Sequence, residues 1–113
     1  MGKMSRTKGA VYENEVCKAI SSFWPSAKRN LSQYQGSDGR DLDNTQPVCF
    51  QLKRRKKITL AEIKIAYIEA EESLDDEHLI PIAGWRNDNG KSMVMLSLDD
   101  LILLLCGVED GAF

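Results

Sequence analysis

One short apolar run, reading V-C-F-Q-L-K, most constrains how this chain can fold. Successive side chains of a strand point to opposite faces. Val48, Phe50 and Leu52 therefore share one face, which we expect to be buried in the core. Gln51 and Lys53 share the other face, about 7 Å apart along the strand. The run predicts a strand with an apolar core face and a polar face that carries an amide and an amine.

Charged side chains flank this strand on both sides. Asp41 lies ten residues before Gln51, and Lys53 opens a block of five cations that ends at Lys57. A carboxylate, an amide and an amine beside such a block suit metal-assisted attack on a phosphodiester. Asp41 and Gln51 are candidate oxygen ligands of Mg²⁺, and Lys53 is a candidate to orient a water or stabilise developing negative charge. The simpler alternative is a solvated strand face followed by surface cations.

Length and composition indicate one domain, residues 1–113, in an intracellular, cytoplasmic protein. A chain of 113 residues supports a modest core. No apolar run reaches the ~18 residues needed to cross a bilayer, so we expect no membrane contact. The first residues lack the apolar segment of a signal peptide. The three cysteines match neither a zinc spacing nor a disulfide framework, and the single histidine, His78, is predicted at the surface or in a turn.

The charges are distributed unevenly along the chain. Residues 1–58 hold 12 of the 15 Lys and Arg and 5 of the 17 acids, and residues 59–113 hold the rest. The net charge of −2 therefore hides a basic first half and an acidic second half. Such asymmetry indicates a polyanion-binding face opposite an acidic face. Alternatively, the two halves neutralise each other in the fold.

Hydrophobic periodicity predicts an α/β domain around a mixed sheet. A helix that spans residues 60–74 has apolar residues on two sides, so it is either deeply buried or shared with a partner. The leucines of the last helix are predicted to be mostly buried, with Gly107 ending that helix. In chain order we expect a flexible basic arm (1–8), a helix (9–23), a short strand (27–31), a strand beginning at or beside 41–43, the central strand, the helix 60–74, paired strands (79–85 and 92–96) and a helix (98–106).

The first half of the chain also resembles a known family. The matching stretches are Lys8-Gly9-x-x-x-Glu13, Gly36-Ser37-x-x-x-Asp41-Leu42 and Gln51-Leu52-Lys53. On these residues the chain resembles the archaeal-type, Hjc-like Holliday junction resolvases of the PD-(D/E)xK restriction-endonuclease-like superfamily. The resemblance implies a restriction-endonuclease-like fold, with a central mixed β-sheet flanked by helices. It also implies catalytic roles for Glu13, Asp41, Gln51 and Lys53, the first three as metal ligands.

The main departure from that family is Gln51, where a glutamate is usual. The related VRR-NUC nucleases use Q-x-K at this point, so the departure moves the charge of the site toward neutral without abolishing the interpretation. Asp38 is a reserve metal ligand, because the loop before the strand offers two acids.

The resemblance further implies a Mg²⁺-dependent endonuclease, with Mn²⁺ as a substitute, that resolves four-way DNA junctions by paired nicks. It implies a homodimer with two active sites, and the interface is expected on the helix 60–74 or on the C-terminal helix with Phe113. Basic residues would contact phosphates in a salt-sensitive, sequence-independent way. The expected DNA-binding residues are Arg6, Lys8, Lys28, Arg29, Arg40, Arg54, Arg55, Lys56 and Lys57.

Three other functions fit the same residues. The first is a related nuclease that acts on flaps, nicks or DNA ends. The second is a non-catalytic DNA-binding module that keeps the basic face. The third is a small structural protein whose acidic half docks a basic partner.

Overall fold

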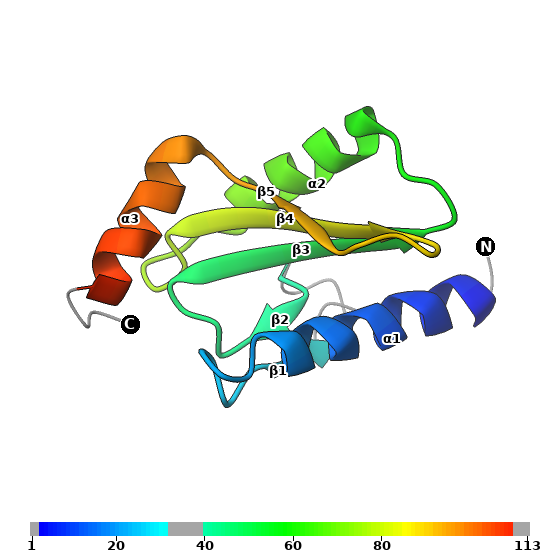
Figure 1. Cartoon of the computed structure of the whole chain (residues 1–113), viewed down its shortest axis with the longest axis horizontal. Helices are drawn as coiled ribbons and strands as arrows, with labels where there is room; N and C mark the ends of the chain where they lie inside the picture. Colours follow the sequence, from blue (N-terminus) through cyan, green and yellow to red (C-terminus); the bar gives the residue numbers. More distant parts are fainter. Residues whose placement is uncertain (1–2, 32–39, 110–113) are drawn as a thin grey trace.

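The predicted strand is β3 (Val48–Arg55), and it forms one side of a mixed three-stranded sheet in the computed structural model, which describes residues 3–31 and 40–109 (Figure 1). It pairs in parallel with β4 (Ile80–Asn87), which pairs in antiparallel fashion with β5 (Met93–Met95). Helices flank this sheet, which confirms the α/β class and the mixed sheet. The predicted hairpin of the last two strands is confirmed as well.

A second, two-stranded sheet lies beside β3. It consists of β1 (Lys28–Arg29) and β2 (Leu42–Asp43), paired in antiparallel fashion. Asp41 links the two sheets through its backbone, because its N–H donates to Phe50 O at 3.0 Å while its carbonyl accepts from Asn30 N at 2.9 Å. The residue with the candidate carboxylate is therefore held by main-chain hydrogen bonds on both sides.

Two helices cover opposite faces of the three-stranded sheet (Figure 1). From α1 (Lys3–Ala19), the buried Tyr12 joins the core cluster that contains Phe50 and Leu52. The connection from β3 to β4 contains α2 (Leu60–Glu72), which buries its own apolar stripe of Ile63, Ala66 and Ala70. Its N-terminus is capped by Thr59, whose side chain accepts a hydrogen bond from Glu62 N at 3.3 Å.

The expected flexible arm of residues 1–8 is corrected by the structure, because α1 already begins at Lys3. No proline interrupts this segment, and Gly9 continues the helix. Lys8 also ties the first part of α1 to the rest of the fold, since its Nζ lies 2.9 Å from the carboxylate of Asp88 in the turn after β4. At the other end the helix stops at Ala19, and residues 20–23 form turns rather than the predicted last helical turn.

The last helix, α3 (Leu98–Glu109), differs most from expectation. Its leucines were predicted to be mostly buried, but Ile102 is 50% exposed and Leu105 is 58% exposed. The helix lies at one end of the sheet rather than across a face, and Leu104 is the residue that packs against the core cluster (Figure 1). Gly107 lies within this helix and does not end it. Although α3 is apolar, neither it nor any other helix in the described ranges has the length and apolar character of a membrane span.

Candidate metal and phosphate site

The carboxylate of Asp41 lies against the backbone of β3. Its Oδ2 accepts a hydrogen bond from Leu52 N at 2.6 Å, and the residue is 8% exposed. Leu52 is the residue between Gln51 and Lys53, so this bond places the acid beside the strand positions that carry the amide and the amine. The structure thus brings together three of the four residues predicted to be catalytic.

Burial dominates the ionisation of Asp41. The pKa of its carboxyl is raised to about 7, chiefly by removal from water and to a lesser extent by the negative charges of Glu13 and Glu69. The hydrogen bond from Leu52 N and the positive charge of Lys53 act in the opposite direction. Near neutral pH this carboxyl is therefore divided between its protonated and its ionised form.

Asp41→Asn should make the protein more stable than the wild type at pH 8 and leave its stability almost unchanged at pH 4. The folded chain keeps the Asp41 proton up to about pH 7, whereas the ordinary pKa is 3.8. Between these values the folded state binds more protons than the unfolded state, so the wild-type free energy of unfolding falls as pH rises. Asparagine removes this titration and still offers an acceptor to Leu52 N. Urea unfolding without divalent cations should show that the two proteins differ in free energy of unfolding, and that this difference grows by about 4 kcal/mol at most from pH 4 to pH 8. A difference independent of pH would contradict the prediction.

Gln51 and Lys53 lie on the face of β3 that α2 covers. The Nζ of Lys53 lies 3.9 Å from Oε1 of Glu69 on α2, while Leu52 points to the opposite, α1 side. The polar strand face expected from the sequence is consequently not open to solvent, because Gln51 is only 4% exposed. Within the described residues, its side-chain amide makes no hydrogen bond. Lys53 remains 30% exposed and is the more accessible of the two.

Glu13 is buried beside the site, but its carboxylate already forms an ion pair with Arg29. Its Oε1 lies 2.8 Å from Nε of Arg29, and the Glu13 side chain is only 8% exposed. Arg29 was predicted to contact DNA, whereas the structure directs its guanidinium into this internal ion pair. The metal-ligand role predicted for Glu13 would require its carboxylate to bind a cation while facing Arg29.

Glu69 is a site residue that the sequence analysis missed. The helix 60–74 was predicted, but no role in the site was assigned to Glu69. Its position next to the buried Ala70 and three residues after the buried Ala66 was the available signal, because such a residue borders the apolar stripe. Its partner Lys53 lies 16 residues earlier on a strand, and no local pattern reveals that contact.

Several predicted DNA-binding cations form ion pairs with the acidic half of the chain. Asp88 accepts two of them, with Lys8 Nζ at 2.9 Å and Arg54 Nε at 3.3 Å. Arg55 Nη1 lies 3.2 Å from Glu62. The alternative in which the two halves neutralise each other is therefore correct for part of the basic block.

Other members of the predicted basic set are not paired in this way. Lys28, Lys56 and Lys57 are exposed and make no ion pair with any residue that the structure describes. Arg6 lies in α1, with its side chain outside the described part of the chain, and Asp38 lies outside the described residues altogether. A hollow of about 330 Å³ opens between the start of α1 and the end of β3. Cations dominate its lining, which comprises Lys8, Gly9, Leu52, Lys53, Arg54, Arg55 and Lys56.

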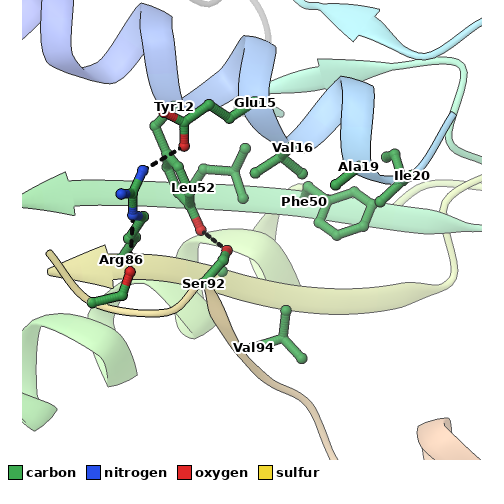
Figure 2. A pocket seen from close by; sticks show the side chains of 12 residues that line it. Tyr12, Glu15, Val16, Ala19, Ile20, Phe50, Leu52, Arg86, Ser92 and Val94 are labelled. Carbon is green, nitrogen blue, oxygen red and sulfur yellow. Dashed lines mark hydrogen bonds and ion pairs between the residues drawn. The ribbon is translucent and has the colours of Figure 1, made fainter.

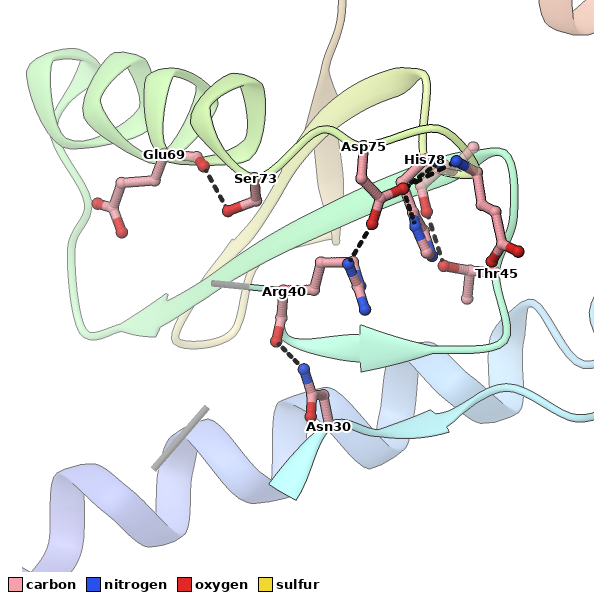
Figure 3. A network of polar contacts seen from close by, with 9 residues as sticks. Asn30, Arg40, Thr45, Glu69, Ser73, Asp75 and His78 are labelled. Carbon is pink, nitrogen blue, oxygen red and sulfur yellow. Dashed lines mark hydrogen bonds and ion pairs between the residues drawn. The ribbon is translucent and has the colours of Figure 1, made fainter. Parts of the chain in front are cut away.

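A polar network fixes Arg40, the residue before the candidate metal ligand (Figure 3). Arg40 Nη1 lies 3.0 Å from Oδ2 of Asp75, whose Oδ1 lies 2.7 Å from Nδ1 of His78. Hydrogen bonding to the His78 side chain, followed by a bond from Glu77 N, lowers the pKa of Asp75 to about 2. The predicted DNA-contacting Arg40 is thus held by an acid, with its side chain 16% exposed.

His78 itself corrects the expectation of a surface histidine. It lies in the turn before β4, as one predicted alternative allowed, but it is 4% exposed. The chain just after it is drawn into the sheet, since Leu79 N and Ile80 N both donate to the carbonyl of Pro47, at 2.8 and 3.0 Å. The Asp75 carboxylate then satisfies the buried ring.

A cavity of about 370 Å³ on the α1 side of the sheet forms a separate feature (Figure 2). Its lining is mostly apolar, and two polar contacts border it: Arg86 Nη1 to Glu15 at 2.7 Å, and the hydroxyls of Tyr12 and Ser92 at 2.5 Å. Because Gln51 and Lys53 project from β3 toward α2, this cavity is not part of the candidate metal site.

The donors around Asp41 suit a magnesium ion that keeps most of its waters. No group of three His, Cys, Asp or Glu side chains in residues 3–31 and 40–109 is arranged to hold a metal. Mg²⁺ is commonly bound through only one or two carboxylates, with water and substrate phosphate as the other ligands. Asp41 and the uncommitted amide of Gln51 meet that minimum, whereas the set is too poor in ligands for a closed structural zinc site.

Comparison with known proteins gives no relative for this chain. A scan against protein-family models, a search of curated proteins and a search of solved structures each found no match.

Proposed function

We propose that this protein is a metal-dependent, structure-selective DNA endonuclease that resolves four-way junctions by paired nicks. The observation that carries the proposal is the hydrogen bond from Leu52 N to Asp41 Oδ2, which holds an acid beside Gln51 and Lys53. The element order of one helix, three strands, a helix, two strands and a helix supports a restriction-endonuclease-like fold for the domain.

The mechanism is hydrolysis of a phosphodiester. A bound Mg²⁺ would supply a water of lowered pKa and neutralise charge on the phosphate. Asp41 and Gln51 would hold that ion with a carboxylate and an amide oxygen. Lys53 would donate hydrogen bonds to the attacking water or to the developing negative charge. Because Lys53 also lines the basic hollow, a phosphate bound there lies next to this amine.

The basic hollow would hold the DNA backbone rather than read bases. Lys56 and Lys57 are the members of the basic block with no ion pair among the described residues, so they are the cations best placed for phosphate contacts. Such contacts weaken steeply with salt and carry no sequence information. Selectivity for a junction would then come from the spacing of two sites.

A homodimer would provide that spacing, since a two-fold axis relates the two strands to be cut. Of the two interfaces expected, α3 is favoured because it exposes a nearly continuous apolar surface at the end of the sheet. Apolar patches of this kind mark interaction surfaces. The exposed members are Leu98, Leu101, Ile102, Leu103 and Leu105.

Leu105→Asp should convert a wild-type dimer to monomers, whereas Ile65→Asp on α2 should leave it dimeric. The two residues are matched, at 58% and 56% exposure, so the substitutions differ in location rather than in chemistry. A charge placed in a buried apolar interface is costly. Sedimentation velocity at micromolar concentration measures the result. A monomeric wild type would end the dimer proposal, and dissociation by Ile65→Asp alone would move the interface to α2.

The decisive experiment is cleavage of labelled four-way junction, flap and linear duplex DNA in Mg²⁺ or Mn²⁺. Paired nicks on the junction alone support the resolvase. Cutting of flaps, nicks or ends would retain the nuclease and discard the junction as its substrate.

A non-catalytic DNA-binding module is the second candidate. It is favoured by one observation, which is that Gln51 stands where an acid is usual and no three-acid metal group lies in the described part of the chain. Salt-sensitive binding of branched DNA, without cleavage in either metal, would select this candidate.

A further inference from the structure

Glu69 extends the candidate site from β3 to α2. Its Oε1 lies 3.9 Å from Lys53 Nζ, at the outer limit of an ion pair, and its side chain is 43% exposed. No hydrogen bond to this carboxylate occurs within the described residues, since Ser73 bonds only to the backbone carbonyl of Glu69 (Figure 3). The acid is therefore near the site, accessible, and weakly held.

The amide of Gln51 points to a ligand at the same place. Gln51 is only 4% exposed, and side chains buried to this degree normally hydrogen-bond their polar atoms within the protein. Its amide makes no side-chain hydrogen bond within residues 3–31 and 40–109, and it is not among the fully enclosed unpaired groups there, so it keeps contact with water and is open to a ligand. Strand alternation directs it to the α2 side, the side on which Lys53 meets Glu69. Gln51 is therefore flanked on β3 by Leu52, whose N–H donates to Asp41, and shares a strand face with Lys53, whose amine meets Glu69 of α2. The charge of Glu69 also acts on the carboxyl of Asp41.

We infer that Glu69 is the second carboxylate of the metal site, supplied by α2 in place of the acid that β3 lacks at Gln51. A divalent cation would be held by Asp41, Gln51 and Glu69, with waters in the remaining positions. Lys53 would then be released from Glu69 to act on the phosphate. This inference rests on the proposed function for the identity of the cation as Mg²⁺ or Mn²⁺.

The alternative acid, Glu13, is less suited to this role. It forms a 2.8 Å ion pair with Arg29, and both side chains are largely buried. Drawing Glu13 to a cation would leave the guanidinium of Arg29 without this partner. Glu69 would give up only a 3.9 Å contact with the Lys53 amine, whose side chain is 30% exposed.

Mn²⁺ affinity in the absence of DNA tests the inference, measured by isothermal titration calorimetry at pH 8. Glu69→Gln should weaken Mn²⁺ binding at least about tenfold, because one of two carboxylate ligands is lost. Glu72→Gln is the matched control, since it removes the same charge from an exposed position of the same helix and should change affinity less than about twofold. Thermal melting in EDTA checks that both variants fold.

A charge relocation sharpens the test. Adding Gln51→Glu to the Glu69→Gln variant should restore Mn²⁺ affinity, because it returns a carboxylate to the strand position. If Glu69→Gln binds Mn²⁺ as the wild type does, or if the wild type binds none, the inference is overturned.

Failure of the inference and failure of the proposed function are distinguishable. A wild type that cleaves junctions while Glu69→Gln keeps full Mn²⁺ affinity retains the nuclease and rejects Glu69. A wild type that binds Mn²⁺ through Glu69 but cuts no DNA retains the site and rejects the nuclease.

Discussion

Lys53→Ala should lower junction cleavage by about 10²–10³-fold, the usual cost of removing one group that stabilises developing charge. The side chain is 30% exposed and lines the basic hollow, and its one ion pair among the described residues is with Glu69, at 3.9 Å. Its removal therefore leaves the core intact. Single-turnover cleavage in Mg²⁺ with saturating enzyme measures the effect on the chemical step alone.

Lys57→Ala is the control for that result. It removes a cation of the same basic block, at an exposed position with no ion pair in the described structure. We expect it to weaken junction binding slightly and to preserve the single-turnover rate. Equal rates for Lys53→Ala and the wild type would show that Lys53 is an ordinary phosphate contact, and equal losses in both variants would show that charge alone matters.

Arg29→Ala should destabilise the protein by about 3 kcal/mol at neutral pH, because removing one partner of a buried ion pair leaves the other charge uncompensated. The remaining charge would be Glu13, whose side chain is 8% exposed, whereas Arg29 is 21% exposed. Urea unfolding followed by circular dichroism gives the difference in free energy of unfolding.

The double variant Arg29→Ala/Glu13→Gln separates this cause from lost packing. Removing the charge of Glu13 as well should recover more than half of the stability, because no buried ion is then unpaired. Lys28→Ala, at the neighbouring exposed position, should change stability by less than about 0.5 kcal/mol. If Arg29→Ala alone is as stable as the wild type, water compensates the charge of Glu13. The ion pair between Arg29 and Glu13 would then be unimportant for the stability of the fold.

Local pattern was sufficient for most elements. The two-residue period around Phe50 predicted β3, and the helix predicted over 60–74 begins just after Thr59, which with Glu62 has the spacing of a capping box. Both signals depend on neighbours within a few residues, so they survive in any tertiary context. The two late strands were predicted to pair, and the Asn-Gly sequence at Asn89 and Gly90 between them is a local signal of the same kind.

Local sequence pattern predicted only part of the candidate site. Gln51 and Lys53 share a strand face by alternation, and Asp41 reaches them because a short turn returns the chain along β3. The partner of Arg29 was not visible, since Glu13 is 16 residues away on a helix. An unassigned cation is more often surface than core, which is why it was read as a DNA contact.

The sequence by itself determined the order of the elements, the core face of β3 and the strand positions of the amide and the amine, because these depend on backbone periodicity. Tertiary structure alone decided that Glu69 meets Lys53, that His78 is buried and that α3 leaves its leucines exposed. Each of these depends on how helices pack against a sheet, so distant residues become neighbours through burial of apolar surface rather than through any spacing along the chain.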